Sequence, residues 1–202
     1  MLALLRFVPG RPLTADTPRA RRMLGSTLAR VHRALRGRRP TSVEHFHWLD
    51  PEAAHLDIEP WVRQGVREAI AAYDGLPPRS LTWGLLHTDP APEAFRFDAR
   101  TATCGLIDWD TAIEGPLLYD LASAVMYVGG LRRATELNDA YLAERVIDPS
   151  EIPRALVPML RLRWAVQADY FARRIAAHDF TGIGGHEENV KGLEDARRAL
   201  GF

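Results

Sequence analysis

Two short apolar segments of this sequence each end in a carboxylate. In "GLLHTDP", His87 and Asp89 follow the first segment, and in "CGLIDWD", Asp108 follows the second. A carboxylate at the point of attack can accept the proton of a hydroxyl group and fix its angle. A second carboxylate on a rigid strand end can hold the magnesium ion that a transferred phosphoryl group needs. The pair therefore fits phosphoryl transfer, with Asp89 as the base and Asp108 as the metal ligand.

Three strand-like segments position these acids, at about 81–87, 94–98 and 103–108. The short link "ARTA" between the last two predicts a β-hairpin, which would hold the two acids at a fixed separation. His-x-Asp alone is more often a surface turn. The indication therefore comes from the whole block: strand, His-x-Asp, hairpin, Ile-Asp-Trp-Asp, and then Gly115 and "YDLA" at 119–122.

Most of the remaining chain is predicted to be helical. Thr17 is a good N-cap, Pro18 suits the first position of a helix, and Pro60 opens a second helix that extends to about Tyr73. Further helices are predicted at about 116–128, 132–145, 151–178 and 186–199. Residues 2–8 are predicted to form a short strand that "PGRPL" ends. The fold class is therefore α+β and mainly α.

Composition limits the range of partners. The chain has 202 residues, a formal net charge of zero and one cysteine. Zero net charge gives no overall attraction to nucleic acid or to an anionic membrane, so neither is an expected partner. No apolar run reaches the ~20 residues of a membrane span, and no signal peptide is recognised at the N-terminus. A single cysteine cannot form an internal disulfide, and we expect a reducing, cytoplasmic location.

The block at 84–122 resembles the aminoglycoside phosphotransferase and choline kinase-like family, which has a protein-kinase-like fold. The family pattern is a His-Gly-Asp loop with an Asn five residues after the Asp, an Ile-Asp-Trp-acidic strand end, a Gly and an Asp-Leu-Ala helix. Upstream, "LLRFVPGRPL" resembles the hinge strand and its turn, and "LARVHRAL" resembles the helix after the hinge.

The resemblance implies a role for each matching residue. Asp89 would be the catalytic base and Asp108 the magnesium ligand. His87 would brace the catalytic loop through backbone hydrogen bonds, and Asp120 would stabilise that loop. The reaction would move the γ-phosphoryl group of ATP or GTP to a small-molecule hydroxyl.

The resemblance also implies an organisation of the chain. Residues 1–15 would be the hinge strand and turn, and residues 16–202 a kinase-like C-terminal lobe with its catalytic loop and hairpin at about 81–110. The nucleotide would bind the hinge backbone near Arg6 and Val8. Because an unpaired apolar edge strand promotes aggregation, we expect a homodimer or another partner to cover the N-terminal strand.

The sequence departs from the family pattern in three ways. Thr88 replaces the Gly of the loop, and Ala94 replaces the metal-binding Asn, for which Asp98 is a candidate substitute and Glu93 a poorer one. The N-terminal lobe, with its Gly-rich loop and its lysine, is expected to be missing, since the only lysine is Lys191. A start site placed too far downstream, an isolated lobe that borrows the rest from another chain, and a degenerate remnant would each explain this.

Three functions remain open on the sequence alone. The first is a phosphotransferase that uses Mg²⁺ and a nucleotide and is truncated or impaired in this chain. The second is a non-catalytic pseudokinase or binding module without a cofactor. The third is a metal-dependent hydrolase built on His87, Asp89 and Asp108, which would need a further metal ligand that the sequence does not indicate.

Overall fold

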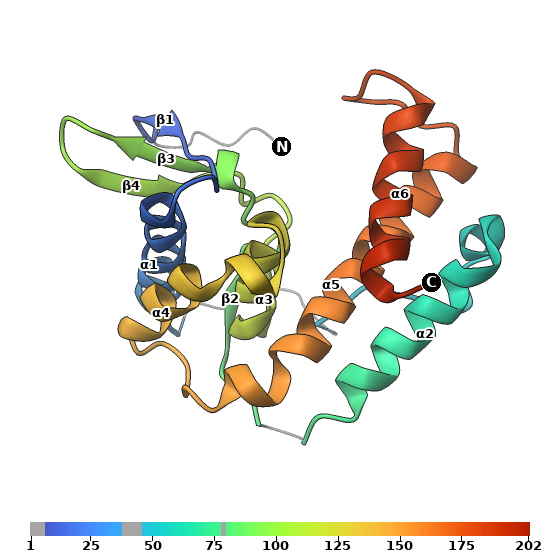
Figure 1. The fold of residues 1–202 in the computed structure, drawn as a ribbon, viewed down its shortest axis with the longest axis horizontal. Helices are drawn as coiled ribbons and strands as arrows, with labels where there is room; N and C mark the ends of the chain where they lie inside the picture. The colour runs from blue at the N-terminus through green and yellow to red at the C-terminus, as the bar shows by residue number, and fades with distance from the viewer. Residues whose placement is uncertain (1–6, 38–45, 78–79) are drawn as a thin grey trace. The chain divides into compact units, whose positions relative to one another are not determined.

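The computed structural model describes residues 7–37, 46–77 and 80–202 (Figure 1). Helices dominate, as predicted, and the strands are short. The helices are α1 (Pro18–Ala34), α2 (Pro60–Asp74), α3 (Leu117–Tyr127), α4 (Thr135–Ala143), α5 (Glu151–Ala176) and α6 (His186–Leu200). The strands are β1 (Arg11–Pro12), β2 (Trp83–Leu86), β3 (Phe95–Asp98), β4 (Thr103–Leu106) and β5 (Ile113–Pro116).

Helix α1 begins where its capping chemistry predicts. The hydroxyl of Thr17 accepts a hydrogen bond from the backbone N–H of Ala20 at 3.1 Å, and Pro18 occupies the first helical position. The predicted apolar face is buried at Leu24 and Leu28, which are 1% and 0% exposed. Helix α2 likewise begins at the proline that the sequence indicates, Pro60. Local residue chemistry is therefore sufficient to start both helices.

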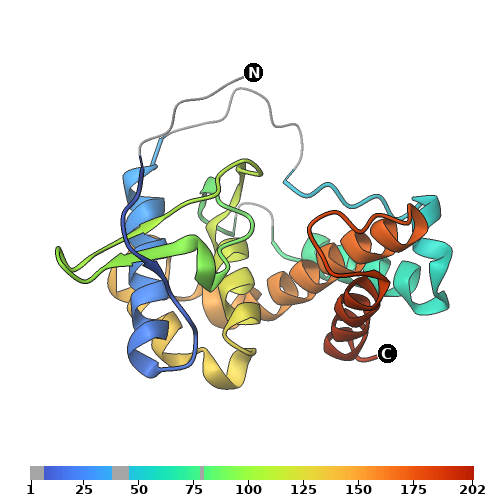
Figure 2. The same ribbon diagram turned by 90° about the horizontal axis from the view of Figure 1, so that it is seen from above.

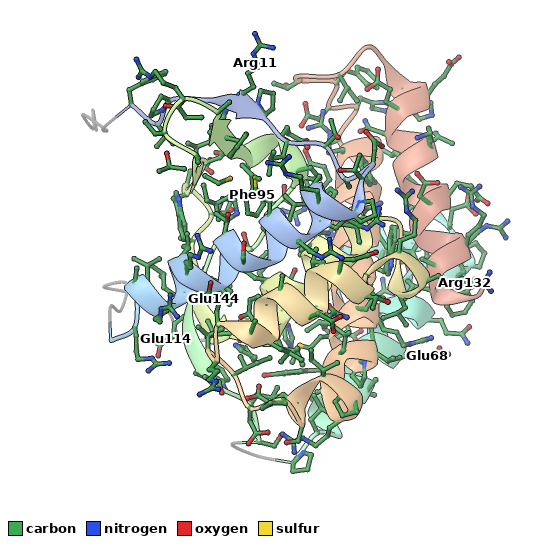
Figure 3. The ribbon with its side chains drawn as sticks, turned by 60° about the vertical axis from the view of Figure 1, so that its left-hand side comes forward. Arg11, Glu68, Phe95, Glu114, Arg132 and Glu144 are labelled. Atoms are coloured by element: carbon green, nitrogen blue, oxygen red, sulfur yellow. The ribbon has the colours of Figure 1, made fainter. Side chains whose placement is uncertain are left out.

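The predicted hairpin is confirmed as β3 and β4. The two strands pair antiparallel, with Phe95 opposite Leu106 and Asp98 opposite Thr103. Strand β1 pairs with the other edge of β3, and together they form one layer beside α1 (Figures 1 and 2). Phe95, labelled in Figure 3, is fully buried and anchors this layer to the interior.

The segment at 81–87 is also a strand, but its partner was not predicted. Strand β2 pairs antiparallel with β5, with Gly84 opposite Gly115 and Leu86 opposite Ile113. A side chain at Gly115 would meet the ring of Phe46 at 2.3 Å and the side chain of Leu86 at 2.6 Å, so only glycine fits there. The chain thus makes a second, two-stranded sheet directly before α3.

The predicted strand at 2–8 is wrong over the part that the structure describes. Residues 1–6, including Arg6, lie outside the described residues, and the two that follow, Phe7 and Val8, are not in a strand. The strand forms instead at Arg11–Pro12, after Gly10, whose φ is +125° and whose missing side chain lets the backbone approach Phe97. Pro9 cannot donate a hydrogen bond to a strand ladder, so pairing begins only after this turn.

The chain forms two compact units, Met1–Phe46 with Leu81–Arg154 and His47–Ser80 with Ala155–Phe202. In the first, α1 packs closely on α4, and Leu28, Leu121, Leu137 and Tyr141 are fully buried. Glu144, labelled in Figure 3, accepts a hydrogen bond from Arg30 Nε at 2.8 Å where these helices end. All of the predicted site residues within the described part belong to this unit.

In the second unit, α2 packs against α6. Gly65 of α2 leaves room for the side chains of Leu200 and Phe202, each 3.2 Å from where a β-carbon would be. Asp169 is almost fully buried and accepts a hydrogen bond from His55 Nε2 at 2.6 Å. Among the described residues, no helix combines the length and the apolar character that crossing a membrane would require.

Candidate active site

The two predicted catalytic acids lie at the ends of different sheets. Asp89 follows β2 and Asp108 follows β4, and both are exposed to solvent. The side chain of His87 links the two segments, because its Nε2 donates a hydrogen bond to the carbonyl oxygen of Ile107 at 2.7 Å. The strand ends are thereby held together immediately before each acid.

Electrostatics also link the two acids. A hydrogen bond with Asp110 raises the pKa of Asp108, and partial burial and the negative charges of Asp110 and Asp89 raise it further. The nearby imidazole of His87 acts in the opposite direction. Asp108 therefore lies within electrostatic reach of two other carboxylates, those of Asp110 and Asp89, and a bound cation would relieve the repulsion.

His87 is placed as a brace. Its side chain is buried and its ring packs edge-on against Trp109, with the ring centroids 4.8 Å apart. Nε2 donates to a backbone carbonyl, and Nδ1 has no hydrogen-bonding partner among the described residues. Its backbone hydrogen bond is of the kind that the resemblance implies for it.

Asp120, in the first turn of α3, binds the backbone of the loop that follows β2. Its fully buried carboxylate accepts hydrogen bonds from the backbone N–H groups of His87 and Thr88 at 2.7 and 2.8 Å, and from His32 Nε2 at 2.9 Å. The other nitrogen of His32 lies 2.7 Å from the hydroxyl of Tyr141, and burial raises the pKa of that phenol well above its usual value. The carboxylate of Asp120 is therefore held by three donors.

The loop is strained where the sequence departs from the family pattern. Thr88 has a φ of +75°, in the left-handed region that favours glycine and penalises a β-branched residue. Its hydroxyl lies 2.8 Å from the hydroxyl of Thr111, and its carbonyl oxygen accepts a hydrogen bond from Ser123 Oγ at 3.4 Å. Asp108 also has a positive φ, +72°. Such conformations persist where the surrounding contacts over-determine them, as they do here.

One residue of the site was missed by sequence reasoning. The hydroxyl of Tyr127, the last residue of α3, donates a hydrogen bond to Asp89 Oδ1. The available signal was spacing, because Asp120, Ser123 and Tyr127 are separated by three and then four residues and so share one face of a helix.

The oxygen ligands at the ends of the strands are of the kind that a magnesium ion takes. Ala94 lies in a short 3₁₀ turn, is buried and has no oxygen in its side chain, while Asp98 closes the hairpin turn at the other end of β3. Glu93 is exposed on the same turn as Ala94. Asp108 and Asp110 remain, and Mg²⁺ is typically bound by one or two carboxylates together with phosphate oxygens and water.

A metal site made wholly of protein side chains is absent from the described residues. They contain no group of three or more His, Cys, Asp or Glu side chains placed to hold a metal ion. The hydrolase hypothesis needs such a group, and the structure offers it no support. The nucleotide site near Val8 stays a prediction: the side chain of Val8 lies over Gly105, where an added β-carbon would meet it at 2.5 Å.

The fold and the family can be compared with known proteins. The family model described as "Phosphotransferase enzyme family" matches residues 2–154. No curated protein matches the sequence. Amicoumacin kinase hAmiN, solved with AMP-PNP, Ca²⁺ and Ami, has a TM-score of 0.67 and 17% identity over 96% of this chain and 63% of that one.

Two further solved structures are similar. A choline/ethanolamine kinase family protein from Mesorhizobium loti has a TM-score of 0.68 and 17% identity over 98% of this chain and 68% of that one. The GDP complex of aminoglycoside 2'-phosphotransferase-IIIa has a TM-score of 0.62 and 18% identity, and the match covers 96% of this chain and 69% of that one.

This chain thus spans 63 to 69% of the length of these three structures. At such identities the likeness shows the fold, which is that of small-molecule kinases. The family match covers most of the sequence, including both predicted acids and the helix that supports them. The chain belongs to the phosphotransferase enzyme family.

Proposed function

We propose that this chain carries the catalytic lobe of a small-molecule kinase, which moves the γ-phosphoryl group of a nucleoside triphosphate to an alcohol. The proposal is supported by the link between the segments of two exposed strand-end acids: His87, two residues before Asp89, donates to the carbonyl oxygen of the residue before Asp108, and the charge of Asp89 raises the pKa of Asp108. The family supports the reaction class. Because the chain spans only part of its structural neighbours, the activity of a whole kinase is part of the proposal.

The side chains divide the work. Asp89 accepts the proton of the acceptor hydroxyl, which then attacks the γ-phosphorus as the bond to the β-phosphate oxygen breaks. Asp120 and His87 fix the loop that carries this base. Asp108 and Asp110 would hold Mg²⁺, which neutralises charge on the phosphates when it is bound.

The neighbours suggest an acceptor class. Their names refer to choline, ethanolamine, an aminoglycoside and aminopropanol, which are all alcohols that also carry a nitrogen. A panel of these four kinds of alcohol is the appropriate first test. The 202-residue chain is incubated with Mg-ATP or Mg-GTP and each acceptor, and release of ADP or GDP that depends on the acceptor is measured.

Matched variants identify the base. Asp89→Ala and Asp89→Asn should lower turnover by about 10²- to 10⁴-fold, the usual contribution of a general base. The control is Asp98→Asn, which removes an acid from the hairpin turn outside the site. Wild-type turnover in Asp89→Ala would refute the role of Asp89, and an equal loss in Asp98→Asn would point to a general effect on folding.

A second candidate is a non-catalytic binding module. Ala94 has no metal-binding oxygen, and these 202 residues include no lysine before Lys191. This candidate predicts no stabilisation by Mg-nucleotide, whereas a ligand at 100 times its Kd would add ~2.7 kcal/mol to the free energy of unfolding. Absence of both turnover and a thermal shift would favour it over the kinase.

A further inference from the structure

Tyr127 contacts the carboxylate of Asp89, the proposed base. A base has to accept a proton, and its carboxylate has to point in a fixed direction while it does so. The hydroxyl of Tyr127 donates a hydrogen bond to Asp89 Oδ1, while the carboxylate itself is exposed. Tyr127 is half-buried, so its ring is anchored by the helix while its hydroxyl reaches the site. A hydrogen bond to a charged acceptor is about twice as strong as one between neutral groups.

Helix α3 contacts the loop through one face. Asp120 accepts from the N–H groups of His87 and Thr88, Ser123 donates to the carbonyl oxygen of Thr88, and Tyr127 donates to the side chain of Asp89. Three loop residues in succession are therefore bound by helix positions that are spaced by three and four. Figure 1 shows α3 beside β2, the strand that leads into this loop.

The sequence around Asp89 makes such a support necessary. Thr88 before it is in a strained conformation, and Pro90 after it has no N–H group to donate. The backbone carbonyl of Asp89 accepts a hydrogen bond from the N–H of Ala91 at 2.8 Å, which fixes the main chain. The phenol of Tyr127 contacts the carboxylate itself.

We propose that Tyr127 is a positioning residue for the base: its phenol holds Oδ1 of Asp89 and so helps to fix the direction of the carboxylate. This inference depends on the proposed function for its catalytic part. A tyrosine suits the task because its ring has only two side-chain torsions. In this role Tyr127 acts through Asp89.

The hydrogen bond between Tyr127 and Asp89 can be tested by NMR, without an activity assay. The chain has five tyrosines, so protein labelled with ¹³C at the tyrosine ζ-carbon gives five signals, and Tyr127→Phe assigns the one of interest. Asp89→Ala removes the acceptor, and we expect the Tyr127 signal to move while the other four stay in place. A Tyr127 signal that does not respond to Asp89→Ala would overturn the inference, whether or not the chain is active.

The catalytic role is tested by kinetics. Tyr127→Phe should lower kcat by about tenfold, which corresponds to about 1.4 kcal/mol, with no change in the KM for nucleotide or in Tm. The matched control is Tyr170→Phe, which removes a phenol that accepts a hydrogen bond from Arg174 at 2.9 Å in the other unit, and it should keep wild-type kcat.

The outcomes separate the two proposals. Wild-type kcat in Tyr127→Phe, or a joint fall of kcat and Tm, would contradict positioning. If the wild-type chain shows no turnover while the Tyr127 signal responds to Asp89→Ala, the proposed function fails and the hydrogen bond between the two side chains is supported.

Discussion

Asp120→Ala should destabilise the chain far more than any other single acid substitution near the site. The carboxylate is fully buried and accepts from two backbone N–H groups and from His32 Nε2. Its removal leaves three buried donors without their acceptor. A buried donor that loses its partner costs about 1–3 kcal/mol, and such losses add incompletely within one network.

The expected size follows from these contacts. Removing one partner of a buried, hydrogen-bonded charge typically costs about 3–5 kcal/mol, so we expect Asp120→Ala to lower the free energy of unfolding by about 4 kcal/mol. Asp120→Asn keeps one oxygen and places an NH₂ group among donors, and about half of that loss is expected. The control is Asp139→Asn on α4, which is exposed and should change stability by less than about 0.5 kcal/mol.

Two measurements check the prediction. With an m-value of about 2 kcal/mol per molar urea, the midpoint of unfolding should fall by about 2 M for Asp120→Ala and about 1 M for Asp120→Asn. Native-state hydrogen exchange should accelerate at the amides of His87 and Thr88, which donate to this carboxylate. A midpoint and an amide protection like those of the wild type would show that Asp120 does not hold the loop.

Three further predictions follow from the first unit. Gly25→Ala should destabilise the chain by about 1–3 kcal/mol, because the added β-carbon would lie 2.1 Å from the carbonyl oxygen of Leu137. The higher helix propensity of alanine, about 1 kcal/mol over glycine, offsets only part of this loss. A rise in Tm would contradict the close packing of α1 on α4. Thr17→Ala should cost about 1 kcal/mol through loss of the N-cap bond to Ala20, measured by urea unfolding, with Thr17→Ser as the variant that retains stability. Burial raises the pKa of the Cys104 thiol, so iodoacetamide at pH 8.5 should alkylate the folded chain more slowly than the urea-unfolded chain. The alkylation rate of the folded chain should rise only at higher pH. Equal rates for the two states would exclude a protected thiol.

Elements whose signals are local were predictable from the sequence. The capping of α1 by Thr17 and the start of α2 at Pro60 depend on chemistry within one turn, and the hairpin depends on a short link between two strand-like segments. Strand β5 was missed because it contains Gly115 and Pro116, which locally indicate a turn, and its partner β2 lies about thirty residues earlier. The strand at 2–8 was predicted from apolar composition, and the constraint at Pro9 and Gly10 moves the pairing to Arg11.

Some residues of the candidate site have a local sequence signal, and others are brought together only by long-range contacts. Asp89 and Asp108 could be singled out because they follow recognisable strands, and the family match supports that alignment. The bond between His32 and Asp120 joins residues 88 positions apart, which no local pattern reveals. Tyr127 lies in an apolar helix where an aromatic residue is most simply interpreted as core, so only its spacing from Asp120 and Ser123 carried a signal.

The shared face of α3 also limits how this part of the chain can change in length. Each residue added to a helix turns everything beyond it by about 100° and advances it by about 1.5 Å. An insertion between Ser123 and Tyr127 would keep Asp120 under the loop and swing the phenol away from Asp89. We therefore expect relatives that keep this site to have no insertion or deletion between Asp120 and Tyr127.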